Sequence, residues 1–303
     1  MKVLGSLKHM LRHYQLYLFV LPMIAYFIIF RYFPMYGVQI AFKDFNPLKG
    51  IWDSPWVGFE HFERFFRSTE ILMIIKNTLL LNVLSLIFGF PVPIILALMI
   101  NQVMRVKFKK FVQTVIYAPH FISTVVIVGM ISLFLSPRSG VINTLLTAVG
   151  MDPVFFMAKP EYFKAIYIIS EIWQHAGWGT IIYLAALASI SPELHESAVV
   201  DGASKWQRVR YIDIPGILPT AVILLILESG RVLSLGFEKV FLMQNNLNRS
   251  ASEVISTYVY KVGIQQADFS YASAIGLFES VICLIVLVSV NGLAKKVTSN
   301  SLW

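Results

Sequence analysis

Residues 71–100 read ILMIIKNTLLLNVLSLIFGFPVPIILALMI, and this stretch decides the class of fold. Lys76 is its only charged residue. An α-helix needs about 20 consecutive apolar residues to cross the hydrocarbon core of a bilayer, and this run is long enough. We therefore expect a transmembrane helix here. Pro91 and Pro93 interrupt the run, so we also expect a kink or a break at that point.

Apolar runs of similar length occur elsewhere in the chain. They cover residues 14–33, 112–135, 163–190, 217–241 and 271–294. The chain of 303 residues is 57% hydrophobic and only 14% charged, whereas soluble domains are about 25% charged. The sequence therefore predicts an all-α membrane protein with six transmembrane helices, which form a single domain over residues 1–303.

The basic residues indicate how the chain is oriented in the membrane. They gather in short clusters between the apolar runs: Lys2, Lys8 and Arg12; Arg105, Lys107, Lys109 and Lys110; Lys205, Arg208 and Arg210; Lys295 and Lys296. Because cytoplasmic loops are enriched in lysine and arginine, we expect both termini and residues 104–111 and 191–216 in the cytoplasm. Residues 43–70 and 244–266 are then outside. The net charge of +8 is spread over these loops rather than gathered on one face, which argues against a nucleic-acid partner and for membrane lipid.

The cytoplasmic segment 193–215, ELHESAVVDGASKWQRVRYIDIP, carries the most information about function. Its pattern predicts a helix, a sharp turn and a second short helix. Asp201-Gly202 is the turn signal, because glycine adopts positive φ without strain. Pro215 and Pro219 are expected to end the second helix and lead into the fifth apolar run.

This segment resembles a loop found in the permeases of ABC importers, the inner-membrane components of binding-protein-dependent transport systems. The matching residues are Glu196-Ser197-Ala198, Asp201-Gly202-Ala203 and Ile212-x-Ile214-Pro215. Ser197 stands where the family has alanine, Val209 where an aromatic residue is usual, and Ile214 where leucine is usual. The resemblance implies the type I importer permease fold, with six transmembrane helices in the bacterial cytoplasmic membrane. It also implies that the loop of about 191–216 couples the permease to an ATPase through Glu196, Ala198, Asp201, Gly202, Ala203 and Pro215.

Other segments resemble the sugar-importing branch of this family. They are Asn77-Thr78, Trp173-Gln174 with Gly177-Trp178, and Tyr271-Ala272-Ser273-Ala274. Residues 36–45 are similar to permeases for complex oligosaccharides, such as fragments of alginate and pectin. The resemblance thus implies three partners: a second, related permease as a heterodimer, a cytoplasmic ATPase dimer, and a periplasmic or lipid-anchored solute-binding protein.

Nothing in the sequence predicts an enzyme. The phosphate-binding pattern G-x-x-x-x-G-K-[ST] is absent, so ATP and Mg²⁺ are expected on the partner ATPase and no cofactor in this chain. The histidines lack metal-ligand spacing, no nucleophile elbow occurs, and Cys283 is the only cysteine. A secondary transporter would need membrane-embedded carboxylates at the interface of a repeat, and no repeat is evident. A scaffold without transport activity is the remaining alternative.

Polar and aromatic residues inside the apolar runs are candidates for the substrate path, because polar groups at membrane depth are costly and mark pathways. The candidates are Gln174, Trp178, Tyr183, Glu228 and Arg231. An aromatic face and hydrogen-bonding groups together suit a sugar ring. Two simpler interpretations stay open: Glu228 and Arg231 form only an ion pair along one helix face, and Trp178 only packs.

The outer loops are too short to form a high-affinity receptor, so we expect substrate to arrive on a separate binding protein. The polar run at the start of the loop 244–266 is the candidate contact for that protein. Its candidate residues are Gln244, Asn245, Asn246 and Asn248.

Overall fold

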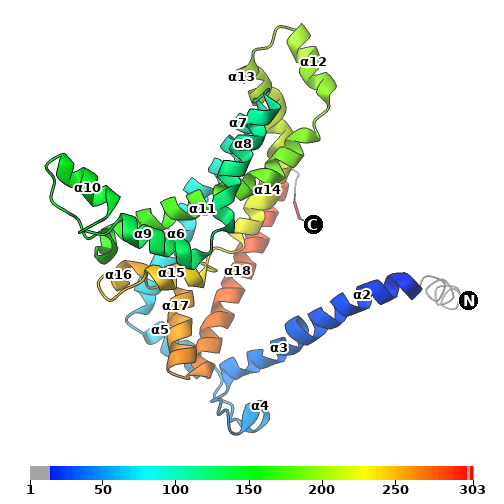
Figure 1. The fold of residues 1–303 in the computed structure, drawn as a ribbon. Coiled ribbons are helices and arrows are strands. Elements are labelled where there is room, and N and C mark those ends of the chain that lie inside the picture. The colour runs from blue at the N-terminus through cyan, green and yellow to red at the C-terminus, as the bar shows by residue number, and fades with distance from the viewer. Residues whose placement is uncertain (1–13, 299–300, 303) are drawn as a thin grey trace, which may run out of the picture. The chain divides into compact units, whose positions relative to one another are not determined.

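The computed structural model describes residues 14–298 and 301–302, which are almost entirely helical (Figure 1). The α-helices are α2 (Tyr14–Phe27), α3 (Phe33–Met35), α4 (Gly50–Asp53), α5 (Glu60–Arg67), α6 (Ile71–Gly89), α7 (Pro91–Asn101), α8 (Val106–Tyr117), α9 (Thr124–Phe134), α10 (Val141–Ala148), α11 (Pro160–Ala188), α12 (Pro192–Val200), α13 (Lys205–Arg208), α14 (Ile214–Ser229), α15 (Phe237–Met243), α16 (Arg249–Ser252), α17 (Ile255–Tyr260) and α18 (Phe269–Thr298). Short 3₁₀ segments are η2 (Tyr36–Phe42), η3 (Ala118–Phe121) and η4 (Phe156–Ala158), and π-helical segments are η1 (Ile28–Tyr32), η5 (Val209–Asp213) and η6 (Lys261–Gln265). These residues contain one isolated β-bridge and no β-strand, so the all-α prediction is confirmed for them. The basic residues Lys2, Lys8 and Arg12 lie outside the described residues.

Four helical stretches are long and apolar enough to cross a membrane. They are Tyr14–Phe42, Ile71–Asn101, Lys205–Ser229 and Phe269–Val297, and they correspond to the first, second, fifth and sixth predicted spans. The second stretch counts as one span although α6 ends at Gly89 and α7 begins at Pro91, so the two prolines interrupt the helix without breaking it apart. A membrane protein with several apolar helices is therefore confirmed.

The predicted third span is not a straight helix. Its two parts, Val106–Phe121 and Thr124–Phe134, meet at an angle of 97° and give a fifth span only if they are taken together. The break follows from local chemistry: Pro119 lies in the 3₁₀ turn, and the Ser123 side chain accepts a hydrogen bond from the backbone N–H of Val126 and so caps a new helix.

The predicted boundaries of the fifth span were wrong. The helix does not end at Pro215 and Pro219 but runs through both of them, from Lys205 to Ser229. Pro215 lies in the first turn of α14, where a missing N–H is tolerated, and the π-helical η5 just before it absorbs the change of register. The chain then leaves the helix at Gly230. Residues 230–236, which the predicted fifth span includes, are therefore not helical.

The predicted fourth span is the single helix α11, but it is less apolar than the other spans. It carries Glu161, Lys164 and Glu171 together with Gln174 and His175, and it does not meet the hydropathy of a span. Helices α6, α7, α8, α14 and α16 pack against it. A helix that is surrounded by protein can carry polar residues that lipid would exclude. The total of six transmembrane helices remains a prediction.

The chain divides into two compact units. The first comprises the described residues up to Phe66 together with Val262–Leu277, and the second comprises Arg67–Lys261 and the residues from Phe278 onward. In the first unit, Arg64 forms an ion pair with Asp268 at 2.7 Å and lies over the ring of Tyr271.

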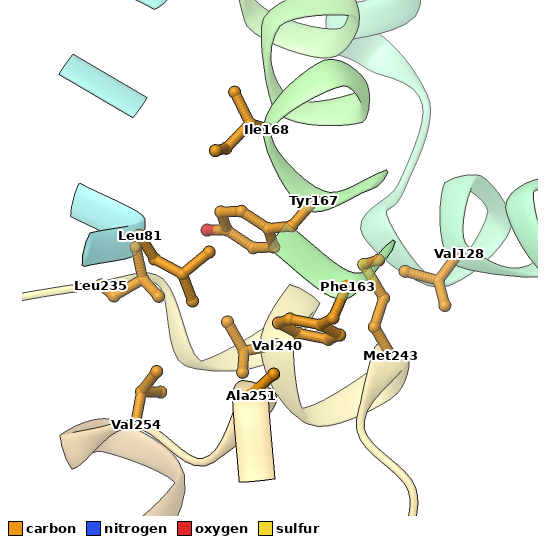
Figure 2. Close-up of a cluster of buried hydrophobic side chains, with 10 residues drawn as sticks. All are labelled: Leu81, Val128, Phe163, Tyr167, Ile168, Leu235, Val240, Met243, Ala251 and Val254. Carbon is orange, nitrogen blue, oxygen red and sulfur yellow. The ribbon is translucent and has the colours of Figure 1, made fainter. Parts of the chain in front are cut away.

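The core of the second unit lies where α6 and α11 meet the segment 235–254. Figure 2 shows Leu81 of α6, Phe163 and Tyr167 of α11, and Val240 and Met243 of α15 directed toward one another. These five side chains are at most 3% exposed. Close van der Waals packing stabilises helix contacts in a membrane protein, so this cluster fixes α15 and α11 relative to each other.

Candidate functional site

The segment that resembles the coupling loop forms an exposed helical hairpin. Helix α12 contains no buried residue, and Figure 1 shows it at one end of the second unit, beyond α13 and the ends of α7 and α8. A turn with Gly202 at a φ of 78° follows it. Ser204 then begins α13 with a capping box, in which its side chain accepts from the Gln207 N–H and the Gln207 side chain accepts from the Ser204 N–H. The predicted order of helix, sharp turn and second helix is confirmed.

The residues predicted to couple the chain to an ATPase lie together on this hairpin or at its exit. Glu196, Asp201, Gly202 and Pro215 are exposed, and Ala198 and Ala203 are half-buried. On α12, Leu194, Val199 and Val200 are exposed apolar side chains, with Val200 at 86%. The chain therefore presents a carboxylate and apolar side chains on a helix that nothing in the described chain covers. Their role in coupling remains a prediction.

Beneath this hairpin lies a polar contact that the sequence did not indicate. Asp213 is completely buried, and the Gln102 side chain at the end of α7 donates to its Oδ2 at 3.2 Å. His195 of α12 places Nε2 3.3 Å from Oδ1. This distance suits an ion pair, but the geometry does not make a hydrogen bond, so Oδ1 has no hydrogen-bond partner. The contact joins α12, α7 and the start of α14.

The second unit has a partly open cavity of about 430 Å³ among its helices. Residues from α6, α7, α11, α14 and the segment 230–236 line it. Of the candidates for the substrate path, Tyr183, Glu228 and Arg231 line this cavity. The side chains of Glu228 and Arg231 form no ion pair with each other in the described part of the chain, so the pairing considered as an alternative is not observed. Both charges are instead available to the cavity.

The other two path candidates do not line the cavity. Gln174 is 3% exposed and lies between the Ile122 carbonyl, to which it donates at 3.4 Å, and the Lys239 ammonium, from which it accepts at 3.4 Å. Trp178 stacks on His120, with ring centroids 4.5 Å apart and planes within 6°. Whether either residue contacts substrate remains a prediction.

A charged cluster beside the cavity escaped the sequence analysis. Lys239 of α15 is 5% exposed and donates to Glu171 of α11 at 2.8 Å. Glu171 also lies 3.4 Å from His175, whose Nδ1 is 3.1 Å from that of His120. Glu171 and His175 line the cavity. The one available signal was a lysine within an apolar run, which needs a counter-charge at membrane depth.

The polar run that begins the outer loop is largely occupied by internal hydrogen bonds. Asn248 is 1% exposed and donates to the carbonyls of Met157 and Met243. Gln244 accepts from Lys261 at 2.6 Å. Asn245 and Asn246 are exposed, although Asn245 also donates to Met157. These two residues thus offer the accessible polar groups, and contact with a binding protein remains a prediction for all four.

The loop is fixed by a buried carboxylate. Glu253 is completely buried and accepts from Lys261 at 2.6 Å, Arg249 at 2.8 Å and Thr257 at 2.8 Å. Burial alone would raise the pKa of this carboxyl, but the hydrogen bonds from these three side chains and the charge of Lys261 outweigh it, so the pKa lies below its ordinary value. Asn77 of α6 holds the same segment by donating to the carbonyls of Ser250 and Glu253.

Comparison with known proteins places this arrangement in a family. The chain is 43% identical to protein LplB of Bacillus subtilis over 95% of this chain and 91% of that protein. It is 46% identical to the polygalacturonan/rhamnogalacturonan transport system permease protein YteP of the same organism, over 93% of this chain and 88% of that protein.

A solved structure of similar length has the same fold. A chain in the crystal structure of a bacterial alginate ABC transporter, in complex with a periplasmic protein bound to an alginate pentasaccharide, superposes with a TM-score of 0.89. It is 44% identical and matches 97% of this chain and 99% of its own length. The family model for the inner membrane component of binding-protein-dependent transport systems matches residues 77–299. With its helical hairpin, its central α11 and this match over most of its length, the chain belongs to the family of binding-protein-dependent transport system inner-membrane components.

Proposed function

We propose that this chain is one of two related membrane-spanning subunits of an ATP-driven importer, which carries acidic oligosaccharides across the bacterial cytoplasmic membrane. The observation that carries this proposal is the exposed hairpin of α12 and Gly202, located on a helical unit with a mostly apolar cavity that Glu228 and Arg231 also line. An uncovered helix bearing Glu196 suits docking into a separate protein. The whole chain acts as a single permease domain over residues 1–303.

Energy for transport comes from a partner. The sequence has no phosphate-binding loop, and the hairpin offers a compact contact for a cytoplasmic ATPase dimer that binds ATP and Mg²⁺. Closure of that dimer on ATP displaces α12, and the displacement changes the side of the membrane to which the cavity opens. In this mechanism Glu196, Ala198, Asp201, Gly202, Ala203 and Pro215 form the contact or its support.

The cavity is the proposed path for the sugar. Its volume of about 430 Å³ falls within the range of small-molecule sites, and Tyr183 with Ser234 and Asn82 supplies an aromatic face and hydrogen-bonding groups. Arg231 adds positive charge that suits the carboxylates of an acidic sugar. The substrate class rests also on two similar proteins, one named for polygalacturonan and rhamnogalacturonan and the other for alginate.

Substrate reaches the cavity from a solute-binding protein. The exposed Asn245 and Asn246 lie on the outer loop, which Glu253 and Asn77 hold in place, and they are the proposed contact. With this loop outside, both termini are cytoplasmic. The second permease is a related chain and forms a heterodimer with this one.

The test is uptake by the reconstituted system. The chain is purified with the ATPase, second permease and binding protein encoded beside it, and placed in vesicles that contain ATP. We expect uptake of a labelled alginate pentasaccharide or a galacturonate oligosaccharide to exceed that of a neutral oligosaccharide of equal length. A complex whose ATPase lacks its phosphate-binding lysine is the matched control and should take up neither.

Two outcomes would contradict the proposal. Uptake at the full rate without the binding protein would remove the docking role of the outer loop. Uptake that persists in vesicles without ATP, or with the disabled ATPase, would indicate an ion-driven transporter.

A further inference from the structure

Few side-chain interactions attach α12 to the rest of the protein. No residue of α12 is buried. Within the described chain, the contact between His195 and Asp213 is the only side-chain hydrogen bond or ion pair that joins α12 to another element. The chain connections also support α12, and Ile190, two residues before it, lies against Gly216 of α14. A force applied to α12 therefore has few routes into the membrane-spanning helices.

Asp213 is placed to receive such a force. It is 0% exposed, and Gln102 at the end of α7 donates to its Oδ2 at 3.2 Å. Asp213 is also the last residue of η5, directly before α14. One carboxylate thus touches α12 on one side and α7 on the other, and belongs to the helix that continues as α14.

The contact is sensitive to small movements. His195 Nε2 lies 3.3 Å from Oδ1, yet Oδ1 accepts no hydrogen bond. A buried acceptor without a partner is energetically costly, so a displacement of α12 that aligns or separates the pair changes the energy of the contact. Arg208 is the other charge acting on Asp213, and its Nε is also buried without a hydrogen bond. The polar groups around Asp213 are therefore incompletely satisfied in this arrangement.

We propose that the His195–Asp213 contact is the joint that passes a displacement of α12 to α7 and α14. This inference rests on the proposed function, because it assumes that α12 is driven by a partner ATPase. His195 and Asp213 are positioning residues: neither lines the cavity, and neither is one of the matched positions of the motif, where Asp213 stands at the variable position between Ile212 and Ile214. Their effect is on the rate of conversion between states and not on binding of the sugar.

The experiment compares His195→Ala, Asp213→Asn and the double variant in the reconstituted complex, with labelled alginate pentasaccharide as the probe. We expect each single variant to lower the maximal uptake rate at least about fivefold, the lower end of typical coupling effects. The half-saturating concentration of the sugar and the amount of co-purified ATPase should be unchanged. The double variant should be no slower than the slower single one, because both substitutions remove the same contact.

Two further variants separate positioning from simple loss of structure. His195→Lys places a basic side chain toward Asp213 and should recover most of the rate. Glu161→Ala changes an exposed residue at the start of α11, outside the loop 191–216, and serves as the control, with uptake at the wild-type rate expected. If Asp213→Asn does not assemble, His195→Ala and Gln102→Ala test the same joint from partly exposed positions.

Uptake at the wild-type rate in His195→Ala, additive losses in the double variant, or loss of the ATPase from the complex would each overturn the joint. An inactive wild-type complex would instead contradict the proposed function on which the joint rests. An active wild type with unaffected variants contradicts the joint alone.

Discussion

At the scale of single residues, Gly202 owes its importance to its backbone. Its φ is 78°, and a Cβ added there would meet no atom within 4 Å. Gly202→Ala therefore introduces no clash but places an L-residue in the left-handed region, at a cost of about 1–2 kcal/mol. We expect this strain to shift the turn and to lower uptake while the protein still reaches the membrane. Gly129→Ala, a helical glycine with equally open surroundings, is the matched control and should transport normally. Equal uptake by both variants would remove Gly202 from the coupling mechanism.

Glu196 contributes through its charge. It is exposed on α12, and no side chain of the described chain is paired with it, so the carboxylate is free to meet a basic group on the ATPase. Truncation of one partner of a desolvated interface pair costs about 2–5 kcal/mol. We expect Glu196→Ala to weaken both co-purification of the ATPase and uptake. Glu161→Ala removes another exposed helical carboxylate, which lies at the start of α11 and outside the hairpin. It should leave both co-purification of the ATPase and uptake unchanged. Assembly and uptake at wild-type levels in Glu196→Ala would leave the hairpin as a surface linker.

The residues predicted correctly have local signals, and those missed do not. The dipeptide Asp201-Gly202 is a local turn signal, so the positive φ of Gly202 could be expected from these two residues. Asp213 and Lys239 acquire their roles from partners that are distant in the sequence: Gln102 is 111 residues from Asp213, and Glu171 is 68 residues from Lys239. No periodicity or spacing reports such pairs, because tertiary packing alone brings them together.

At the scale of elements, the approach of α11 to the end of α8 depends on one glycine. A Cβ on Gly177 would overlap the backbone carbonyl oxygen of Ile116, and backbone cannot move aside as a flexible side chain can. We expect Gly177→Ala to force the two helices apart and to destabilise the protein by about 1–3 kcal/mol, the usual cost of overpacking. Thermal unfolding of the purified protein in detergent measures this effect. Gly276→Ala in α18 has open space around it and should leave the unfolding temperature unchanged. Equal unfolding temperatures for the two variants would contradict the close packing.

The segment of α16 and α17 is expected to loosen in acid. Because the pKa of Glu253 is lowered in the folded protein, its ion pairs contribute their full stability above the ordinary value of 4.5 and lose it as the pH falls through the lower folded value. The protection factors for hydrogen exchange of residues 249–260 should therefore fall below about pH 4, and at neutral pH they should be lower in Glu253→Gln than in the wild type. Protection factors that are insensitive to acid in the wild type would contradict the role of this carboxylate. Glu63→Gln, in an outer helix of the other unit, is the control.

The elements also show where local rules fail. Pro215 and Pro219 predicted the end of a helix, but the structure has a helix through both. A proline in a helix removes one N–H donor, and its ring clashes with a carbonyl of the preceding turn. Both effects are tolerated when the proline lies in the first turn of a helix or when the preceding turn is widened to a π-helix. Here Ile214 donates to Val209, five residues back, and so provides that widening. The sequence contains no separate signal for such a turn.

At the scale of the whole molecule, α11 decides the topology. If α11 crosses the membrane and the bent pair of α8 and α9 counts as one span, the total is even and both termini lie on the same side. Glu171, Lys164 and His175 make α11 too polar to be recognised by its hydropathy. Its apolar residues nevertheless pack in the core of the second unit. The basic clusters 105–110 and 205–210 both indicate the cytoplasm, so an even number of crossings lies between them, and α11 crosses if the bent pair of α8 and α9 crosses once.

Single cysteines in a Cys283→Ser background test this topology. All four positions, Lys110, Lys205, Asn246 and Lys296, are exposed and so accessible to a membrane-impermeant maleimide. We expect Asn246→Cys to react in intact cells, and the three lysine variants to react only after the membrane is permeabilised. Lys205→Cys reports on α11 directly, because one crossing separates it from the segment before Pro160, which the basic-residue distribution places outside. Labelling of position 205 from outside would mean that α11 does not cross, that α12 cannot meet a cytoplasmic ATPase, and that the proposed mechanism is wrong. Labelling of Lys296→Cys from outside with Lys205→Cys protected would instead leave the hairpin in the cytoplasm and change only the course of the last helices.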